Sequence, residues 1–191
     1  MTGKISHIDA YILAGGKSSR MGTDKGLILF RGKPLIERVI EQLYPLFKSI
    51  YIVSNNHDYD RFGLQVIEEI ITEKPLNKLH LREELNHTLK LAAKLSLSFK
   101  TLKEIGPAGG IHASLGNTQS DKIFIVSCDM PFITTNAIQF IIRHSAGSQI
   151  ALPVYHEQIQ PLFGVYSKNC LPNWKRLIQQ KIIKLQEMVT H

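Results

Sequence analysis

The stretch that most constrains this 191-residue chain is Tyr11–Lys33, which reads YILAGGKSSRMGTDKGLILFRGK. Its first apolar run ends abruptly in Ala-Gly-Gly, which indicates a buried strand that leads into a loop. Glycines let the backbone approach a ligand closely, and exposed N–H groups at such a loop suit a phosphate. Arg20 and Lys25 would add positive charge. The stretch therefore predicts a phosphate-binding loop, and the plainer alternative is a strand-to-helix turn with solvated basic residues.

The loop matches neither of the two most familiar glycine patterns. A P-loop requires lysine directly after its second glycine, but Thr23 follows Gly22 here. The pattern G-x-G-x-x-G is also absent from the stretch. P-loop NTPases and dinucleotide-dependent dehydrogenases are therefore disfavoured.

Further apolar runs alternate with segments of helical spacing. Continuous apolar runs predict strands buried on both faces, and their alternation with helices predicts a mostly parallel sheet. We expect a single Rossmann-like α/β domain over residues 1–191, with a mostly parallel central sheet flanked by helices. The expected strands are 10–13, 50–53, 66–67, 123–126, 150–154 and 162–166, and the expected helices are 34–46, 134–144 and 173–188.

Three of the expected strands end in glycine or polar residues. These ends are Gly15-Gly16, Ser54-Asn55-Asn56 and Cys128-Asp129. In a parallel sheet, ligands bind beyond the carboxyl ends of the strands. The three ends should therefore lie together along one edge and form a site.

Charge and composition limit the classes of partner that this chain is expected to bind. With 23 basic and 16 acidic residues the net charge is +7, which suits anionic partners, although such a balance can also serve solubility alone. The chain has no basic run with interleaved aromatic residues, so we expect phosphorylated small molecules and not nucleic acid. No apolar segment suggests a signal peptide or a membrane span, and two cysteines make no disulfide framework, which predicts a cytoplasmic protein. The histidines show no zinc-type pairing.

Two further segments carry candidate chemistry. The glycine-rich stretch Glu104–Ala113 indicates a loop that opens a helix. Such a loop could bind the edge of a base at close range, or it could be a plain turn. Asp129 follows a buried strand, where it could bind Mg²⁺ or cap a helix, and the residues alone leave both open. Cys128 is expected to be a small buried apolar residue and not a nucleophile.

The segment LAGGKSSRMGTDKG resembles the signature of the molybdenum cofactor guanylyltransferases, which join GMP to molybdopterin. Nucleotide-sugar pyrophosphorylases share a looser version, L-A-[GA]-G-x-x-x-R-[ML]. Gly32-Lys33-Pro34-Leu35 extends the match to the molybdenum branch. A G-P-x-x-G loop and a C-D-x-P motif, both features of the family, follow in the expected order.

The resemblance implies a fold of the nucleotide-diphospho-sugar transferase type and transfer of GMP from GTP to molybdopterin with release of pyrophosphate. It implies Mg²⁺ as cofactor, held by Asp129. A terminal phosphate of molybdopterin is already ionised, so no general base is expected. Proteins of molybdoenzyme maturation are a further expected class of partner. The implied catalytic residues are Arg20, Lys25 and Asp129, and the implied GTP-binding residues are Leu13, Ala14, Gly15, Gly16, Lys25, Asn56, Glu69, Gly106, Gly110 and Asp129.

The chain departs from the family pattern in three places. Glu69 stands where the family usually has aspartate. Residues 72–103 look like an insertion, in which apolar spacing predicts an amphipathic helix. The chain stops early, at His191, with no match to the Asn-x-Asn-Thr-Pro segment that helps hold molybdopterin in the family.

These departures keep two alternatives open. One is a related nucleotidyltransferase with another base or acceptor, such as a cytidylyltransferase, against which the G-P-x-x-G loop argues. The other is a nucleotide-binding homologue without catalysis, which would bind GTP and form no product.

Overall fold

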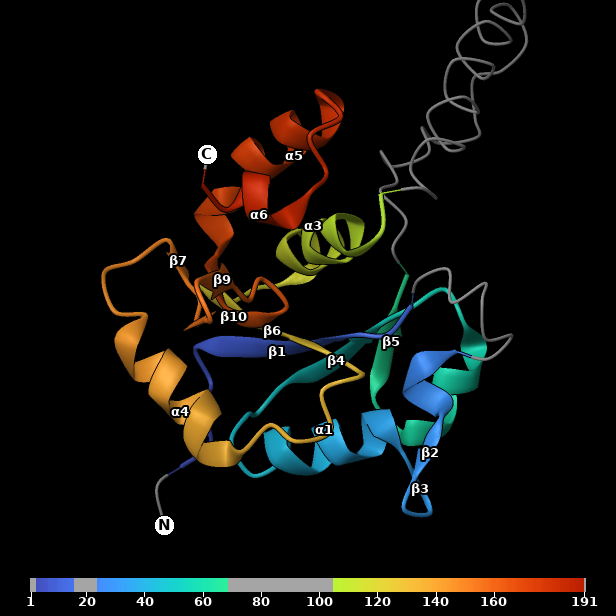
Figure 1. Ribbon diagram of the computed structural model, residues 1–191. Helices are drawn as coiled ribbons and strands as arrows, with labels where there is room; N and C mark the ends of the chain where they lie inside the picture. Colours follow the sequence, from blue (N-terminus) through green and yellow to red (C-terminus); the bar gives the residue numbers. More distant parts are fainter. Residues whose placement is uncertain (1–2, 16–23, 69–104, 191) are drawn as a thin grey trace, which may run out of the picture.

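The computed structural model describes residues 3–15, 24–68 and 105–190. A six-stranded sheet forms the centre of the fold, with strand order β5-β4-β1-β6-β10-β7 (Figure 1). Strands β5, β4, β1 and β6 run parallel to one another, and β10 runs antiparallel to β6 and β7. The predicted mostly parallel sheet is confirmed. The strands are β1 (Ile8–Leu13), β4 (Ile50–Val53), β5 (Gln65–Ile67), β6 (Lys122–Ser127), β7 (Ile150–Ala151) and β10 (Phe163–Ser167).

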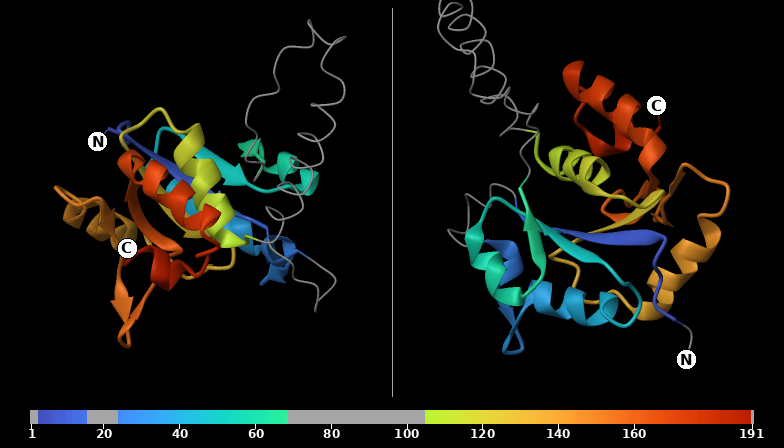
Figure 2. Two further views of the ribbon diagram at one scale, coloured as in Figure 1. Left: turned by 90° about the horizontal axis from the view of Figure 1, so that it is seen from above. Right: turned by 180° about the vertical axis from the view of Figure 1, so that it is seen from behind.

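Helices cover both faces of the sheet (Figures 1 and 2). Helices α1 (Leu35–Leu43) and α4 (Thr135–His144) lie on one face, and their apolar residues join a core with Ile12 and Val126. Helices α3 (Pro107–Asn117), α5 (Leu171–Gln179) and α6 (Leu185–Met188) lie on the other. Every residue of β1 is buried, which is why residues 10–13 form a continuous apolar run.

The remaining elements are short. Two hairpins, β2 (Leu29–Phe30) with β3 (Lys33–Pro34) and β8 (Val154–Tyr155) with β9 (Gln158–Ile159), pair outside the main sheet. The 3-10 turns are η1 (Lys25–Leu27), η2 (His57–Phe62) and η3 (Lys168–Cys170). The strand predicted over 150–154 is divided between β7 and β8 at Leu152-Pro153, because proline has no N–H to continue a ladder.

The prediction of a single helix over residues 173–188 is wrong. The segment forms two helices, because α5 ends in a Schellman motif. The N–H of Ile182 donates to the carbonyl of Leu177 over 3.0 Å, and the N–H of Lys181 donates to the carbonyl of Ile178 over 2.9 Å. Lys181 adopts a left-handed conformation with φ 61°. This position usually carries glycine, so a lysine there hid the helix end from the sequence reading.

Two further expectations concern the insertion at residues 72–103 and membrane-spanning segments. The helix expected within residues 72–103 lies outside the described residues, so the expected insertion stays a prediction. Within the described part of the chain, every helix is too short or too polar to cross a bilayer.

His112 is a buried histidine on the inner side of α3. Among the described residues, its Nε2 atom has no hydrogen-bond partner. Burial lowers the pKa of His112 below its ordinary value of 6.5, and the nearby charge of Lys175 lowers it further. The unfolded chain therefore takes up a proton at this site at a higher pH than the folded chain does.

We predict that this histidine makes the fold less stable in acid. The stability it contributes is present above pH 6.5 and is lost as pH falls below that value, because protonation then favours the unfolded chain. His112→Leu should reduce the loss of unfolding free energy between pH 7.5 and 5.5, measured by urea denaturation. His7→Leu, at an exposed histidine, is the matched control and should leave the loss unchanged. Equal pH dependence in the wild type and His112→Leu would contradict the assignment.

Candidate active site

The carboxyl ends of β1, β4 and β6 meet at one edge of the sheet. Leu13, the last residue of β1, lies between Val53 of β4 and Ser127 of β6. Backbone bonds continue beyond the strands: the N–H of Ala14 donates to the carbonyl of Val53 over 2.9 Å, and the N–H of Cys128 donates to the carbonyl of Leu13 over 3.0 Å. The three polar strand ends therefore lie side by side, as the sequence pattern predicts.

Lys25 and Asp129 face each other at this edge. The Nζ atom of Lys25 lies 3.3 Å from Oδ2 of Asp129, although the two residues are 104 positions apart in the chain. Their side chains are 56% and 36% exposed, so both groups remain accessible to a ligand from solvent. The hydroxyl of Ser127 donates to Oδ1 of Asp129 over 2.6 Å and orients the carboxylate.

The structure excludes one of the two readings of Asp129, that of a helix cap. Helix α4 begins later in the chain and is capped by Thr134, whose hydroxyl accepts from the N–H of Ala137 over 3.2 Å. Asp129 is therefore not a helix cap. Its carboxylate is turned toward Lys25 at the strand end, the position expected of a cation or phosphate-site ligand.

Cys128 precedes Asp129 and is buried. Burial raises the pKa of its thiol to about 12, and the carboxylates of Asp129 and Asp24 raise it as well. The thiol therefore stays protonated at neutral pH and is a poor nucleophile. The expectation that Cys128 acts as a small buried apolar residue is confirmed.

Helix α3 presents its first turn to the same edge. Its far end is fastened to the start of β1, where the hydroxyl of Thr118 donates to Oδ2 of Asp9 over 2.5 Å. The amide of Asn117 donates to the hydroxyl of Tyr11 over 3.1 Å. Because the helix thus runs antiparallel to β1, its N-terminus lies near the carboxyl end of that strand.

The glycine-rich stretch is more helical than expected. Gly106 precedes α3 with φ 60°, a conformation that favours glycine, and Pro107 begins the helix. Gly110 lies inside the helix and is buried. The stretch opens a helix as expected, but the loop ends at Gly106 and Gly110 already belongs to the helix.

The other residues expected at the site divide into three groups. Gly15 is exposed at the edge, whereas Leu13 and Ala14 are buried and use backbone groups within the sheet. The side chain of Asn56 accepts from the N–H of Asp58 over 2.9 Å, so it caps η2 and is at least partly structural. Gly16, Arg20 and Glu69 lie outside the described residues.

Sequence reasoning missed Asp24 and Tyr59. The carboxylate of Asp24 accepts from the buried hydroxyl of Tyr59 and from the N–H of Gly26, next to Lys25. Burial and this hydrogen bond raise the pKa of the Tyr59 hydroxyl well above 10, so it remains a donor. The sequence signal was the triplet Asp24-Lys25-Gly26, of which only the lysine was given a role.

Position 26 requires glycine because its backbone lies very close to Tyr59 and Cys128. A Cβ atom on Gly26 would lie 2.5 Å from the hydroxyl oxygen of Tyr59 and 3.1 Å from Sγ of Cys128. Only glycine fits there without displacing its neighbours. This close packing sets the backbone of Lys25 against the strand end that carries Asp129.

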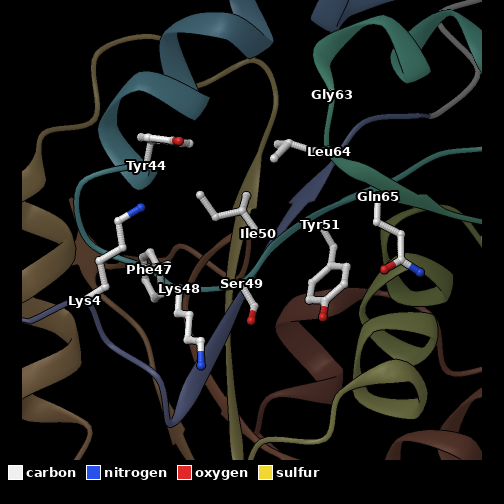
Figure 3. Close-up of a pocket in the computed structure, with 10 residues that line it drawn as sticks. All are labelled: Lys4, Tyr44, Phe47, Lys48, Ser49, Ile50, Tyr51, Gly63, Leu64 and Gln65. Carbon is white, nitrogen blue, oxygen red and sulfur yellow. The ribbon is translucent and has the colours of Figure 1, made fainter.

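A hollow of about 280 Å³ lies away from this edge, near the amino ends of β4 and β5 (Figure 3). Lys4 reaches over the ring of Tyr44, with 4.1 Å from its nitrogen to the ring centre. Lys48 points the other way in Figure 3, so the charged groups do not converge on one point. Of the expected site residues that the structure describes, none lines this hollow.

Comparison with known proteins decides the family. The model of the MobA-like NTP transferase domain matches residues 10–189, which is most of the chain. The chain belongs to the MobA-like NTP transferase family. It is therefore related to nucleotidyltransferases, and the resemblance seen in LAGGKSSRMGTDKG is confirmed.

Curated members of the family are similar over most of this chain. It is 35% identical over 181 residues to the molybdenum cofactor guanylyltransferase of Vibrio parahaemolyticus, an alignment that covers 91% of this chain and 77% of the relative. It is 29% identical over 183 residues to a probable molybdenum cofactor guanylyltransferase of Flavobacterium johnsoniae, covering 95% and 80%.

Two solved structures share the fold of this chain. Molybdopterin-guanine dinucleotide biosynthesis protein A from Archaeoglobus fulgidus superimposes with a TM-score of 0.67 at 22% identity, covering 96% of this chain and 79% of that one. A CMP:2-keto-3-deoxy-manno-octonic acid synthetase complexed with CTP superimposes with a TM-score of 0.58 at 11% identity, covering 98% and 86%. Because the fold accommodates a pyrimidine nucleotide in that neighbour, fold alone does not specify the base.

We predict that Gly26→Ala destabilises the protein by about 1–3 kcal/mol, because the new methyl group overlaps Tyr59 and Cys128. Gly116→Ala in α3 is the matched control, since a Cβ there meets nothing within 4 Å. The control should leave the free energy of unfolding unchanged or raise it by up to about 1 kcal/mol. Urea denaturation of both variants checks the prediction, and equal stabilities would contradict the packing described.

Proposed function

We propose that this protein transfers GMP from GTP to molybdopterin and releases pyrophosphate. The observation that carries the proposal is the Lys25–Asp129 pair, 3.3 Å apart at the carboxyl edge of the sheet, in a chain of the MobA-like NTP transferase family. The names of the curated relatives support guanylyl transfer to the molybdenum cofactor as the reaction.

Asp129 fits the role of a Mg²⁺ ligand. The described residues contain no cluster of three or more His, Cys, Asp or Glu side chains that could hold a metal. Mg²⁺ at a nucleotide needs only one or two carboxylates, and its other ligands are phosphate and water. A single carboxylate at a strand tip, partly exposed to solvent and oriented by Ser127, meets that requirement. When bound, the metal ion would offset negative charge on the phosphates.

The reaction needs positioning and charge more than acid–base chemistry. A phosphate oxygen of molybdopterin forms a bond to the α-phosphorus of GTP, and the bond from that phosphorus to the bridging oxygen breaks. Pyrophosphate leaves with the electron pair. The nucleophile is already an anion, so no side chain has to take a proton from it.

Lys25 and Asp129 would exchange partners when the nucleotide binds. In the structure each offsets the charge of the other. A triphosphate with Mg²⁺ supplies a negative partner for Lys25 and a positive partner for Asp129 at once. The ammonium of Lys25 would then stabilise the charge that grows on the departing pyrophosphate. The first turn of α3 would lie beside the base, and Arg20 would assist at the phosphates.

The proposal predicts pyrophosphate release that requires GTP, Mg²⁺ and molybdopterin together. Lys25→Ala should lower kcat by about 100-fold, because it removes charge that matters most in the transition state. Asp129→Asn should lower it similarly, since the amide is a poor Mg²⁺ ligand. Lys48→Ala, at an exposed lysine away from the edge, is the matched control and should keep the wild-type rate. A coupled pyrophosphate assay measures all four proteins.

The same assay separates the alternatives. Faster release of pyrophosphate from CTP than from GTP would favour a cytidylyltransferase. The structural neighbour complexed with CTP is the reason for testing that nucleotide. GTP binding without release of pyrophosphate would favour the non-catalytic homologue. A Lys25→Ala variant with an unchanged rate would contradict the assignment of that residue.

A further inference from the structure

Asp24 is the centre of a small hydrogen-bond network beside Lys25. Its Oδ1 atom accepts from the hydroxyl of Tyr59 and from the N–H of Gly26, the latter over 3.3 Å. Its Oδ2 atom lies 3.5 Å from the amide nitrogen of Asn56, a weak contact. Tyr59 and Asn56 belong to the connection between β4 and β5, so this network ties two separate segments together.

Both chain neighbours of Lys25 depend on the same tyrosine. Asp24 accepts its hydrogen bond, and Gly26 packs so closely that a Cβ would lie 2.5 Å from its oxygen. Tyr59 itself is fully buried, which gives it little freedom to move. The backbone on either side of Lys25 is therefore anchored to the core.

Among the described residues, the side chain of Lys25 has no comparable anchor of its own. It is 56% exposed and its ion pair with Asp129 is open to solvent. Exposed ion pairs of this kind are worth only about 0–1 kcal/mol. A flexible lysine held so weakly points in one direction only if its backbone is fixed.

We propose that Asp24, Asn56 and Tyr59 form a clamp that aims Lys25 at the phosphate site, with Tyr59 as its principal positioning residue. This inference rests on the proposed function for its consequence in catalysis. Tyr59 and Asn56, together with the N–H of Gly26, give the Asp24 carboxylate three donors. Without them, that carboxylate would compete with Asp129 and with phosphate for the ammonium of Lys25.

Tyr59→Phe tests the clamp because it removes one hydroxyl and keeps the ring. We expect kcat to fall about tenfold, with a smaller change in KM for GTP, because misplacing a charged group acts mainly on the transition state. Tyr11→Phe is the matched control: Tyr11 is also fully buried, and its hydroxyl accepts from Asn117 over 3.1 Å. The control should keep kcat within about twofold of the wild type, even if its Tm falls as far as that of Tyr59→Phe.

A double-mutant cycle shows whether the loss passes through Lys25. If the tyrosine acts only by positioning the lysine, Lys25→Ala with Tyr59→Phe should be no slower than Lys25→Ala alone. A further tenfold loss in the double variant would mean that Tyr59 acts by another route and would overturn the clamp.

Chemical labelling tests the clamp independently of activity. Competitive acetylation of the wild type and Tyr59→Phe, read by peptide mass spectrometry, reports the environment of each lysine amine. We expect Lys25 to be labelled at least threefold faster in Tyr59→Phe and Lys48 to be unchanged. An unchanged Lys25 rate would overturn the clamp even in an active enzyme, whereas a changed rate in a chain without turnover would retain the clamp and reject the proposed function.

Discussion

The burial of β1 on both faces and along both edges is the constraint on which the rest of the structure depends. All six residues of the strand are buried, and it pairs with β4 on one side and β6 on the other. A strand in this position has little room for charge along its length. Its one buried carboxylate, Asp9, is satisfied by the hydroxyl of Thr118 at the start of the strand. Groups that meet a ligand are therefore confined to the strand ends, where Gly15 and the segments that follow β4 and β6 lie.

The site combines opposite charges within a basic chain. The net charge of +7 favours the approach of an anion, but the charged residues described at the edge include two aspartates, Asp24 and Asp129, beside Lys25. Each carboxylate has its own donors: Asp129 has Ser127 and Lys25, and Asp24 has Tyr59 and Gly26. This division gives the two aspartates different roles. Asp129 is accessible to a cation, whereas Asp24 is committed to holding the loop that carries Lys25.

Much of this arrangement could be predicted from the sequence, because it follows from local patterns. The apolar runs predicted β4 at Ile50–Val53 as observed, and the polar strand ends predicted one shared edge. The unpredicted parts depend on contacts between distant residues or on backbone conformations that the residue type conceals. Lys181 ends α5 in a conformation typical of glycine, and Tyr59 reaches Asp24 across 35 positions of the chain. A tyrosine on a short turn carries no sequence signal for such a contact.

The central claim is that the Lys25–Asp129 edge holds the triphosphate and its metal ion. A crystal structure with Mg²⁺ and a non-hydrolysable GTP analogue tests it most directly. The account predicts a metal ion bound by Asp129 at about 2.1 Å, with Lys25 moved from Asp129 to a phosphate oxygen. A nucleotide bound elsewhere, or one bound beside a Lys25–Asp129 pair that remains intact, would contradict it.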